Sequence, residues 1–411
     1  MTIRVAADLA AVVALDSASS AIASARRAAL AGRYAPGSFA VEWRGLDRLS
    51  EIAAHWRELA ARALEPNIFY EPAFLLAAAP ILAPDAGAVL VWSSEQPQKL
   101  LGLLPARIEH RRYAIKLPVL VGLTHRFGPL GLPLVDREAA EPVIAALFAH
   151  LATDSNLPGI ILLPLLPEDG PFAAALDAFA RRAQMPAADF NRHRRALFEP
   201  GGDRAGYVKR AVGKHRLKEL RRQVRRLSEI GAVMFTGATE PAAVAGGLDD
   251  FFSLEARGWK GRAGTAIADD ANLTAFIRTA MTGLAAEGKV SIYRIMLDGR
   301  AIAAAIVLRS GQSAWFWKIA YDEALARFSP GVMLTVEVTH ELADDANIAR
   351  ADSCATANHP MIDRLWRERL ELCDRMIAVR PQTPLVLARH LEGMRSAALT
   401  GARRIRSRLA G

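Results

Sequence analysis

The predicted order of helices and strands repeats in the two halves of the chain, and this repeat constrains the fold more than any other sequence feature. In the second half, apolar or alternating runs at 290–297 and 300–309 are joined by Asp298-Gly299, and a third run follows at 313–320. An Asp-Gly pair between two such runs strongly favours a β-hairpin. Helical patterns precede this strand meander, and a helix followed by a strand comes after it.

The remaining predicted elements of the second half surround the meander. They are a basic helix at 207–230, a strand at 232–236, helices at 241–256 and 271–287, and then a helix at 331–343, a strand at 349–355, a helix at 361–372 and a strand at 375–379. The first half shows the same order, with a strand at 39–43, helices at 46–64 and 73–79, a hairpin of 88–92 with 100–109, a helix at 138–152, a strand at 160–163 and a helix at 172–183. We therefore predict an α+β fold of two tandem domains, each with a mixed, mostly antiparallel sheet flanked by helices.

A chain of 411 residues has room for two to three domains. The Gly/Pro-containing stretch near 195–207, just before the basic helix, marks the expected break. We predict a weakly ordered segment at 1–37, a first domain at 38–203, a second domain at 204–384 and a basic C-terminal helix or tail at 385–411.

Positive charge is concentrated in one segment. The net charge is +9, and ten cations but only two anions lie between Arg204 and Glu229. Such a patch favours an anionic partner, which could be a phosphorylated cofactor, nucleic acid or an acidic membrane surface.

The two cysteines, Cys354 and Cys373, make neither a disulfide framework nor a metal-site spacing, so we expect a reducing compartment and no metal. We also expect neither a membrane span nor a signal peptide, because the best early apolar run, at 9–15, is short and bracketed by aspartates. Fingerprints of phosphate-binding loops, dinucleotide sites and serine hydrolases are missing from the sequence as well.

Three segments carry candidate chemistry. In the first segment, Ser329-Pro330-Gly331 begins a helix that follows a strand. The N–H groups of a first helical turn can hold a phosphate; the alternative is that these residues only cap the helix. In the second, a helix containing Glu255 ends in a glycine loop with Trp259 and Lys260, which could grip an acceptor or cofactor, or could simply be a solvated helix end.

The third segment places Asp352 on a buried strand and His359 at the following turn. His359 is the histidine best placed for proton transfer, with Asp352 as an orienting partner. The alternative is that Asp352 forms a structural pair and that His359 caps a helix.

These residues, in this order, resemble the CelD/BcsL-like acyltransferases of the GNAT (Gcn5-related N-acetyltransferase) superfamily. The resemblance covers about residues 205–380, and the first half is similar only to the looser N-terminal part of that family. The tandem arrangement also resembles the FemAB-type aminoacyltransferases, which pair two GNAT-like domains. The matching motifs are the basic helix with Glu229-Ile230-Gly231, Leu254-Glu255, Trp259-Lys260-Gly261, Gly299 to Ala303, Lys318 with Tyr321-Asp322, Ser329-Pro330-Gly331, Asp352 to Ala355 and His359-Pro360 to Trp366.

The resemblance implies two GNAT-like domains, the first of them degenerate, and acyl-CoA as co-substrate, with its pyrophosphate at Ser329, Pro330 and Gly331. Two departures stand out: the usual multi-glycine pyrophosphate loop is missing, and residues 361–372 lack the usual tyrosine acid. Proton transfer is then expected from His359, Asp352 or Glu255. The substrate-binding candidates are Trp259, Lys260, Lys318, Tyr321 and Asp322.

The expected reaction is direct attack of an amine on the acyl thioester, for which positioning supplies most of the rate. The family name suggests an acceptor from envelope polysaccharide or lipid synthesis, such as an amino sugar or a sphingoid-like base. We expect a cytoplasmic enzyme, peripheral at the inner membrane if the basic patches contact acidic lipid. Two alternatives are aminoacyl transfer from tRNA and a non-catalytic nucleic-acid-binding protein; the second is disfavoured because the basic helix fits no known DNA-reading motif.

Overall fold

The computed structural model describes residues 38–380 and 383–409, so the segment predicted to be weakly ordered, 1–37, lies outside the described residues. The chain divides into two compact units. Of the described residues, the first comprises 38–65, 85–192, 372–380 and 383–409, and the second comprises 66–84 and 193–371. The domain boundary predicted near 195–207 lies close to the junction between the two units at 192–193. Residues 66–84 belong to the second unit instead of the first, and the chain returns to the first unit at residue 372.

The first unit has a mixed sheet in the order β1, β2, β3, β4, β6 and β13, with β5 beside β3. Strand β4 pairs with β6 in parallel, whereas the pairs β1–β2, β2–β3, β3–β4, β3–β5 and β6–β13 are antiparallel. Its strands are β1 (Phe39–Gly45), β2 (Gly87–Ser93), β3 (Leu100–Glu109), β4 (Val119–Gly122), β5 (Leu134–Val135), β6 (Ile160–Pro167) and β13 (Glu368–Ala378). Its helices are η1 (Leu46–Ile52), α2 (Ala53–Arg62), α4 (Ala140–Thr153), α5 (Pro171–Arg182) and α12 (Leu385–Leu409).

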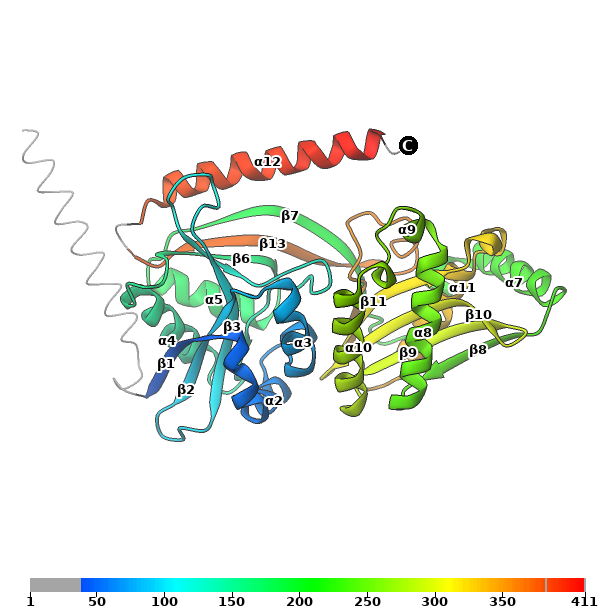
Figure 1. Ribbon diagram of the computed structural model, residues 1–411, viewed down its shortest axis with the longest axis horizontal. Coiled ribbons are helices and arrows are strands. Elements are labelled where there is room, and N and C mark those ends of the chain that lie inside the picture. The colour runs from blue at the N-terminus through cyan, green and yellow to red at the C-terminus, as the bar shows by residue number, and fades with distance from the viewer. Residues whose placement is uncertain (1–37, 381–382, 410–411) are drawn as a thin grey trace, which may run out of the picture. The chain divides into compact units, whose positions relative to one another are not determined.

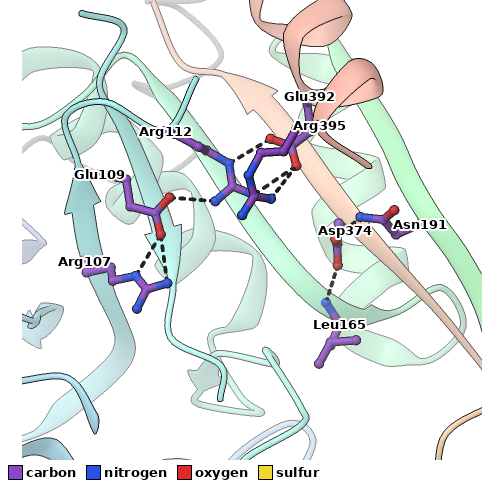
Figure 2. A network of polar contacts seen from close by, with 8 residues as sticks. All are labelled: Arg107, Glu109, Arg112, Leu165, Asn191, Asp374, Glu392 and Arg395. Atoms are coloured by element: carbon purple, nitrogen blue, oxygen red, sulfur yellow. Dashed lines mark hydrogen bonds and ion pairs between the residues drawn. The ribbon is translucent and has the colours of Figure 1, made fainter. Parts of the chain in front are cut away.

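Helix α12 is held on the first unit by a buried ion pair (Figure 2). Glu392 is fully buried and accepts hydrogen bonds from Nε of Arg112 at 2.7 Å and from Nη2 at 2.9 Å. Arg112 also donates to Glu109 at 2.7 Å. Ala388, one turn before Glu392, packs in an apolar cluster with strand residues Ile160 and Met376. Apolar burial and a paired charge together fix the start of this helix.

The second unit contains a sheet in the order β7, β12, β11, β10, β9 and β8. Strands β11 and β12 are parallel; the pairs β7–β12, β10–β11, β9–β10 and β8–β9 are antiparallel. The strands are β7 (Ala187–Phe198), which begins in the first unit, β8 (Val233–Ala238), β9 (Val290–Leu297), β10 (Arg300–Ser310), β11 (Ser313–Tyr321) and β12 (Arg350–Asp352). The helices are η2 (Ile68–Tyr70), α3 (Pro72–Leu82), α6 (Tyr207–Val212), α7 (Lys214–Ser228), α8 (Pro241–Arg257), α9 (Trp259–Arg262), η3 (Ile267–Asp269), α10 (Ala271–Ala286), η4 (Glu323–Phe328) and α11 (Pro330–Asp344).

Helices cover both faces of the second sheet, because its strands present apolar side chains on both sides. On one face, Trp315 packs edge-on against Phe69, and Trp317 against Phe74, with α10 and α8 alongside (Figure 1). On the other face, Ile295 and other strand residues form a core with α6, α7 and α11. The start of α11 is thereby positioned beside the end of β11.

The α+β class and the mixed, mostly antiparallel sheets flanked by helices are confirmed. Two predicted helices are wrong. The basic helix 207–230 is broken at Gly213, where φ is 80°, so that α6 and α7 are separate helices. Residues 361–372 form turns and then β13, because Leu370 and Leu372 alternate with exposed or half-exposed charges and pair as a strand.

Within the described residues, none of the helices combines the length and the hydropathy that a membrane span requires.

Candidate active site

Helix α11 begins where a strand has just left the sheet. Strand β11 pairs in parallel with β12 only from Ser313 to Trp315, and it then continues to Tyr321. The short helix η4 follows and ends at Ser329, whose backbone is left-handed with φ of 56°. Pro330 is the first residue of α11, and the Ser329 side chain makes no capping hydrogen bond. The first-turn N–H groups and the positive end of the dipole make this start suitable for an anion.

Gly331 lies against the ring of Tyr321. A Cβ added at Gly331 would be 2.9 Å from Cδ1 of Tyr321, closer than normal packing allows. Gly331 itself is buried and Tyr321 is 38% exposed. The glycine therefore has a packing function in addition to any role in ligand binding.

Glu255 is a buried carboxylate whose two oxygens are both engaged. Oε1 accepts from Nζ of Lys260 at 2.5 Å, and Oε2 accepts from the backbone N–H of Ile267 at 2.8 Å. These two bonds connect the end of α8 to α9 and to η3. The pair holds the glycine loop in place, and it brings two of the predicted site residues, Glu255 and Lys260, into direct contact.

Glu323, which the sequence analysis did not single out, links this loop to the end of β11. Its carboxylate accepts from the backbone N–H of Trp259 at 2.7 Å and from Nη2 of Arg262 at 2.5 Å. The hydrogen bond from Arg262 and then that from Trp259 lower the pKa of Glu323. The neighbouring Asp322 caps η4 through Ala324 N–H at 3.0 Å. Trp259 is 61% exposed, which leaves its indole available to a ligand.

Asp352 forms a buried ion pair with Arg195, a residue of β7. Its Oδ2 accepts from Nη2 of Arg195, and its Oδ1 accepts from the backbone N–H of Cys354 at 2.9 Å. Burial, and then the charge of Asp352, raise the pKa of the Cys354 thiol, while Arg195 and Lys318 act in the opposite direction. Cys354 therefore stays a neutral thiol at physiological pH, which argues against an acyl-carrying thiolate. Lys318 lies on β11, the strand that pairs in parallel with β12.

His359 lies in the turn-rich segment that follows β12. Its Nδ1 atom is buried and has no hydrogen-bond partner among the described residues. Its backbone carbonyl accepts from Asp363 N–H at 3.1 Å. The residue as a whole is half-buried, so part of it is accessible to a ligand, whereas Nδ1 is not.

The predicted residues thus form two groups within the second unit. Contacts join Trp259, Lys260 and Glu255 with Glu323, and hence with the segment that leads from Tyr321 to Gly331. A separate cluster contains Asp352 and Cys354, and Lys318 lies on the neighbouring strand β11. The carboxylate of Asp352 is bonded to Arg195 and Cys354 rather than to His359. Within the described residues, no group of three or more His, Cys, Asp or Glu side chains is arranged to hold a metal ion.

Residues 214–359 match the family model described as an acetyltransferase (GNAT) domain. This stretch runs from the first residue of α7 to His359, so it contains all of the site residues predicted from the sequence. No curated protein matches the sequence.

Solved structures match over most of the chain. The C-terminal domain of a putative lysylphosphatidylglycerol synthetase from Agrobacterium fabrum has 12% identity and a TM-score of 0.53, covering 85% of this chain and 96% of that one. FemX has 8% identity and a TM-score of 0.54, with 82% and 98% covered. At these identities the likeness concerns the fold alone. The support for a GNAT acyltransferase domain comes from the family match to residues 214–359.

Proposed function

We propose that the protein is an acyl-CoA-dependent N-acyltransferase of the CelD/BcsL-like type, acting on an amine in envelope polysaccharide or lipid synthesis. The observation that carries the proposal is the start of α11. Within the stretch that matches the GNAT model, Ser329-Pro330-Gly331 begins a 15-residue helix beside the end of β11, just after β11 loses its parallel partner.

The residues at this start fit the phosphates of coenzyme A in charge and shape. The first helical turn offers N–H groups, and the cation Arg327 lies two residues before Ser329. The left-handed Ser329 turns the chain into α11. When bound, acyl-CoA supplies an activated thioester. In our proposal Ser329, Pro330 and Gly331 hold its pyrophosphate, and Trp259, Lys260, Lys318, Tyr321 and Asp322 contact the substrates.

His359 is our proposed general base. The amine nitrogen attacks the thioester carbonyl, the carbon–sulfur bond breaks, the coenzyme leaves as thiolate, and the amine proton goes to the imidazole of His359. Asp352 and Glu255 are less suited to this role, because each carboxylate already bonds to a cation and to a backbone N–H. We assign them to holding the backbone around the site, with Glu255 as the next candidate base.

Calorimetric titration with acetyl-CoA and a long-chain acyl-CoA tests the donor directly. We expect saturable binding that is lost in a Gly331→Val variant, and mass spectrometry should detect coenzyme A or its esters in the purified protein. Release of free thiol that depends on an added amine tests the reaction. A protein that binds no acyl-CoA and releases no thiol with any amine would contradict the proposal.

A second candidate is aminoacyl transfer from tRNA. It is favoured by the fold similarity to FemX and by the exposed cations of α7, among them Arg221, Arg225 and Arg226. Binding of tRNA that falls steeply with salt, together with aminoacyl transfer and no acyl-CoA binding, would favour this candidate instead.

A further inference from the structure

A cavity of about 420 Å³ lies inside the second unit, between α6, α7, β8, β9 and α11. Its α7 wall is made by Leu217, Leu220 and Val224, which are three of the four apolar residues of that helix's stripe. Phe235, Ile295 and Met333 line the other walls. The volume is at the lower end of the range of about 300–1,000 Å³ for small-molecule sites.

Exposed residues of α6, α7 and α11 line the cavity, so it is open to solvent. Val224 lines it and is nevertheless 37% exposed, so apolar surface continues to the protein exterior. Two exposed cations, Lys209 and Arg221, also line it. On the α11 side the exposed residues are Glu337 and His340.

Aliphatic and aromatic side chains surrounding a hollow give water few partners, so the cavity favours an apolar occupant. A pair of cations at its edge favours an anionic group beside that occupant. Glu337 on the opposite wall repels a second anionic group. The combination describes an amphiphile with one apolar chain and one compact anionic head.

We propose that this cavity binds a single alkyl chain of an anionic amphiphile, with Lys209 and Arg221 contacting the head group. The site is separate from the start of α11, because the α11 residues that line it begin at Met333, one turn further along the helix. It therefore goes beyond the proposed acyltransfer, and its test requires no catalysis. The same chemistry is offered by a free alkyl phosphate or fatty acid and by a single-chain lipid in a bilayer.

Calorimetry with octyl, decyl and dodecyl phosphate, each kept monomeric, measures chain binding. Each methylene that enters the cavity should tighten binding about fourfold, until the cavity is full. Equal affinity for the three chain lengths would overturn the proposal.

Two adjacent arginines provide a charge-matched comparison. Arg221 lines the cavity, whereas Arg222 does not line it and donates to Glu219 at 2.7 Å. Arg221→Gln should weaken dodecyl phosphate binding about tenfold or more, and Arg222→Gln should leave it within about twofold, since only one of the two lost charges contacts the head. Equal losses in both variants would show a diffuse cationic surface and overturn the proposal.

A bulky residue at the opening tests the cavity itself. Val224→Trp should abolish chain binding at an unchanged Tm, while Ile230→Trp, at an exposed apolar residue outside the lining, should bind like the parent. Parental affinity in folded Val224→Trp would refute the site.

Vesicles of anionic phospholipid, prepared with and without single-chain lipid, distinguish a free amphiphile from a single-chain lipid in a bilayer as the source of the ligand. If Val224→Trp no longer binds monomeric alkyl phosphate, the cavity is the binding site for either source. If the parent binds no monomer, and both the parent and Val224→Trp bind vesicles equally, the protein has a membrane-contact surface and the cavity proposal is wrong.

Discussion

The aromatic ring of Tyr321 packs on the backbone of Gly331, so the end of strand β11 and the first turn of helix α11 touch at the one position where a side chain has no room. Two constraints can require glycine at position 331: the ring of Tyr321 leaves no space for a side chain, or a bound phosphate approaches the backbone of Gly331. The two constraints predict different behaviour when both residues are changed.

We expect Gly331→Ala to lower acyl-CoA affinity at least about tenfold, which corresponds to about 1.4 kcal/mol, and to lower Tm because its Cβ meets Tyr321. The double variant Gly331→Ala with Tyr321→Ala should recover Tm, since the clash is gone, while acyl-CoA binding stays weak. Calorimetry and thermal unfolding of both variants and of Tyr321→Ala alone check this. Full recovery of affinity in the double variant would show that the glycine serves only packing.

His359→Ala should reduce acyl transfer about 10²–10⁴-fold, because a positioned general base typically contributes that much. Tm should change little, since Nδ1 makes no hydrogen bond that the substitution would break within the described residues. Turnover measured from pH 6 to 9 is the readout. His215→Ala, at an exposed histidine of α7, is the matched control and should retain parental turnover. Parental rates in a folded His359→Ala at every pH would remove His359 from the mechanism and make Glu255 the next residue to test.

Local sequence signals were sufficient for the centre of the second unit. The apolar runs with Asp298-Gly299 between them predicted β9 and β10, and Pro330 at the start of an apolar stretch predicted α11. These elements depend on turn chemistry and periodicity within a few residues, which a single sequence displays directly.

The sequence alone did not predict contacts between residues that are far apart in the chain. Arg195 and Asp352 are 157 residues apart, and the charged stretch around Arg195 reads as a linker although it forms the end of β7. Strand β7 lacks a clean alternation, and its neighbours in the sheet, β13 and β12, both come much later in the chain. Glu323 was missed for a similar reason: its partners Trp259 and Arg262 lie more than 60 positions earlier in the chain.

The Arg112–Glu392 pair should make the stability of the first unit fall in acid. Burial acts to raise the pKa of Glu392, but the hydrogen bond and charge of Arg112 outweigh it, so the folded-state pKa lies below the usual value. A depressed carboxyl pKa contributes stability that is present above the unfolded-state pKa and is lost as the pH falls through the folded-state value. The loss should therefore begin below about pH 4.

Urea unfolding from pH 3 to 7 measures that contribution. Glu392→Gln should cost about 1–3 kcal/mol at pH 7, because Arg112 loses one of its two carboxylate partners, and should flatten the acid limb of the curve. Glu95→Gln, at an exposed residue of the same unit, should leave the curve as in the parent. An acid limb unchanged by Glu392→Gln would mean that other carboxylates control acid unfolding.

The last prediction separates structure from catalysis at Asp352. Asp352→Asn should lower the free energy of unfolding by about 3–5 kcal/mol, because it leaves the buried guanidinium of Arg195 without its counter-charge. The double variant Arg195→Met with Asp352→Asn removes both charges together, so no uncompensated charge stays buried, and the asparagine Oδ1 can still accept from Cys354 N–H. If Asp352 only supports the fold, the double variant should recover both Tm and acyl transfer; if Asp352 also orients His359, Tm should recover while turnover stays low. Measuring the two properties on the same preparations therefore assigns Asp352 to the fold alone or to the reaction as well.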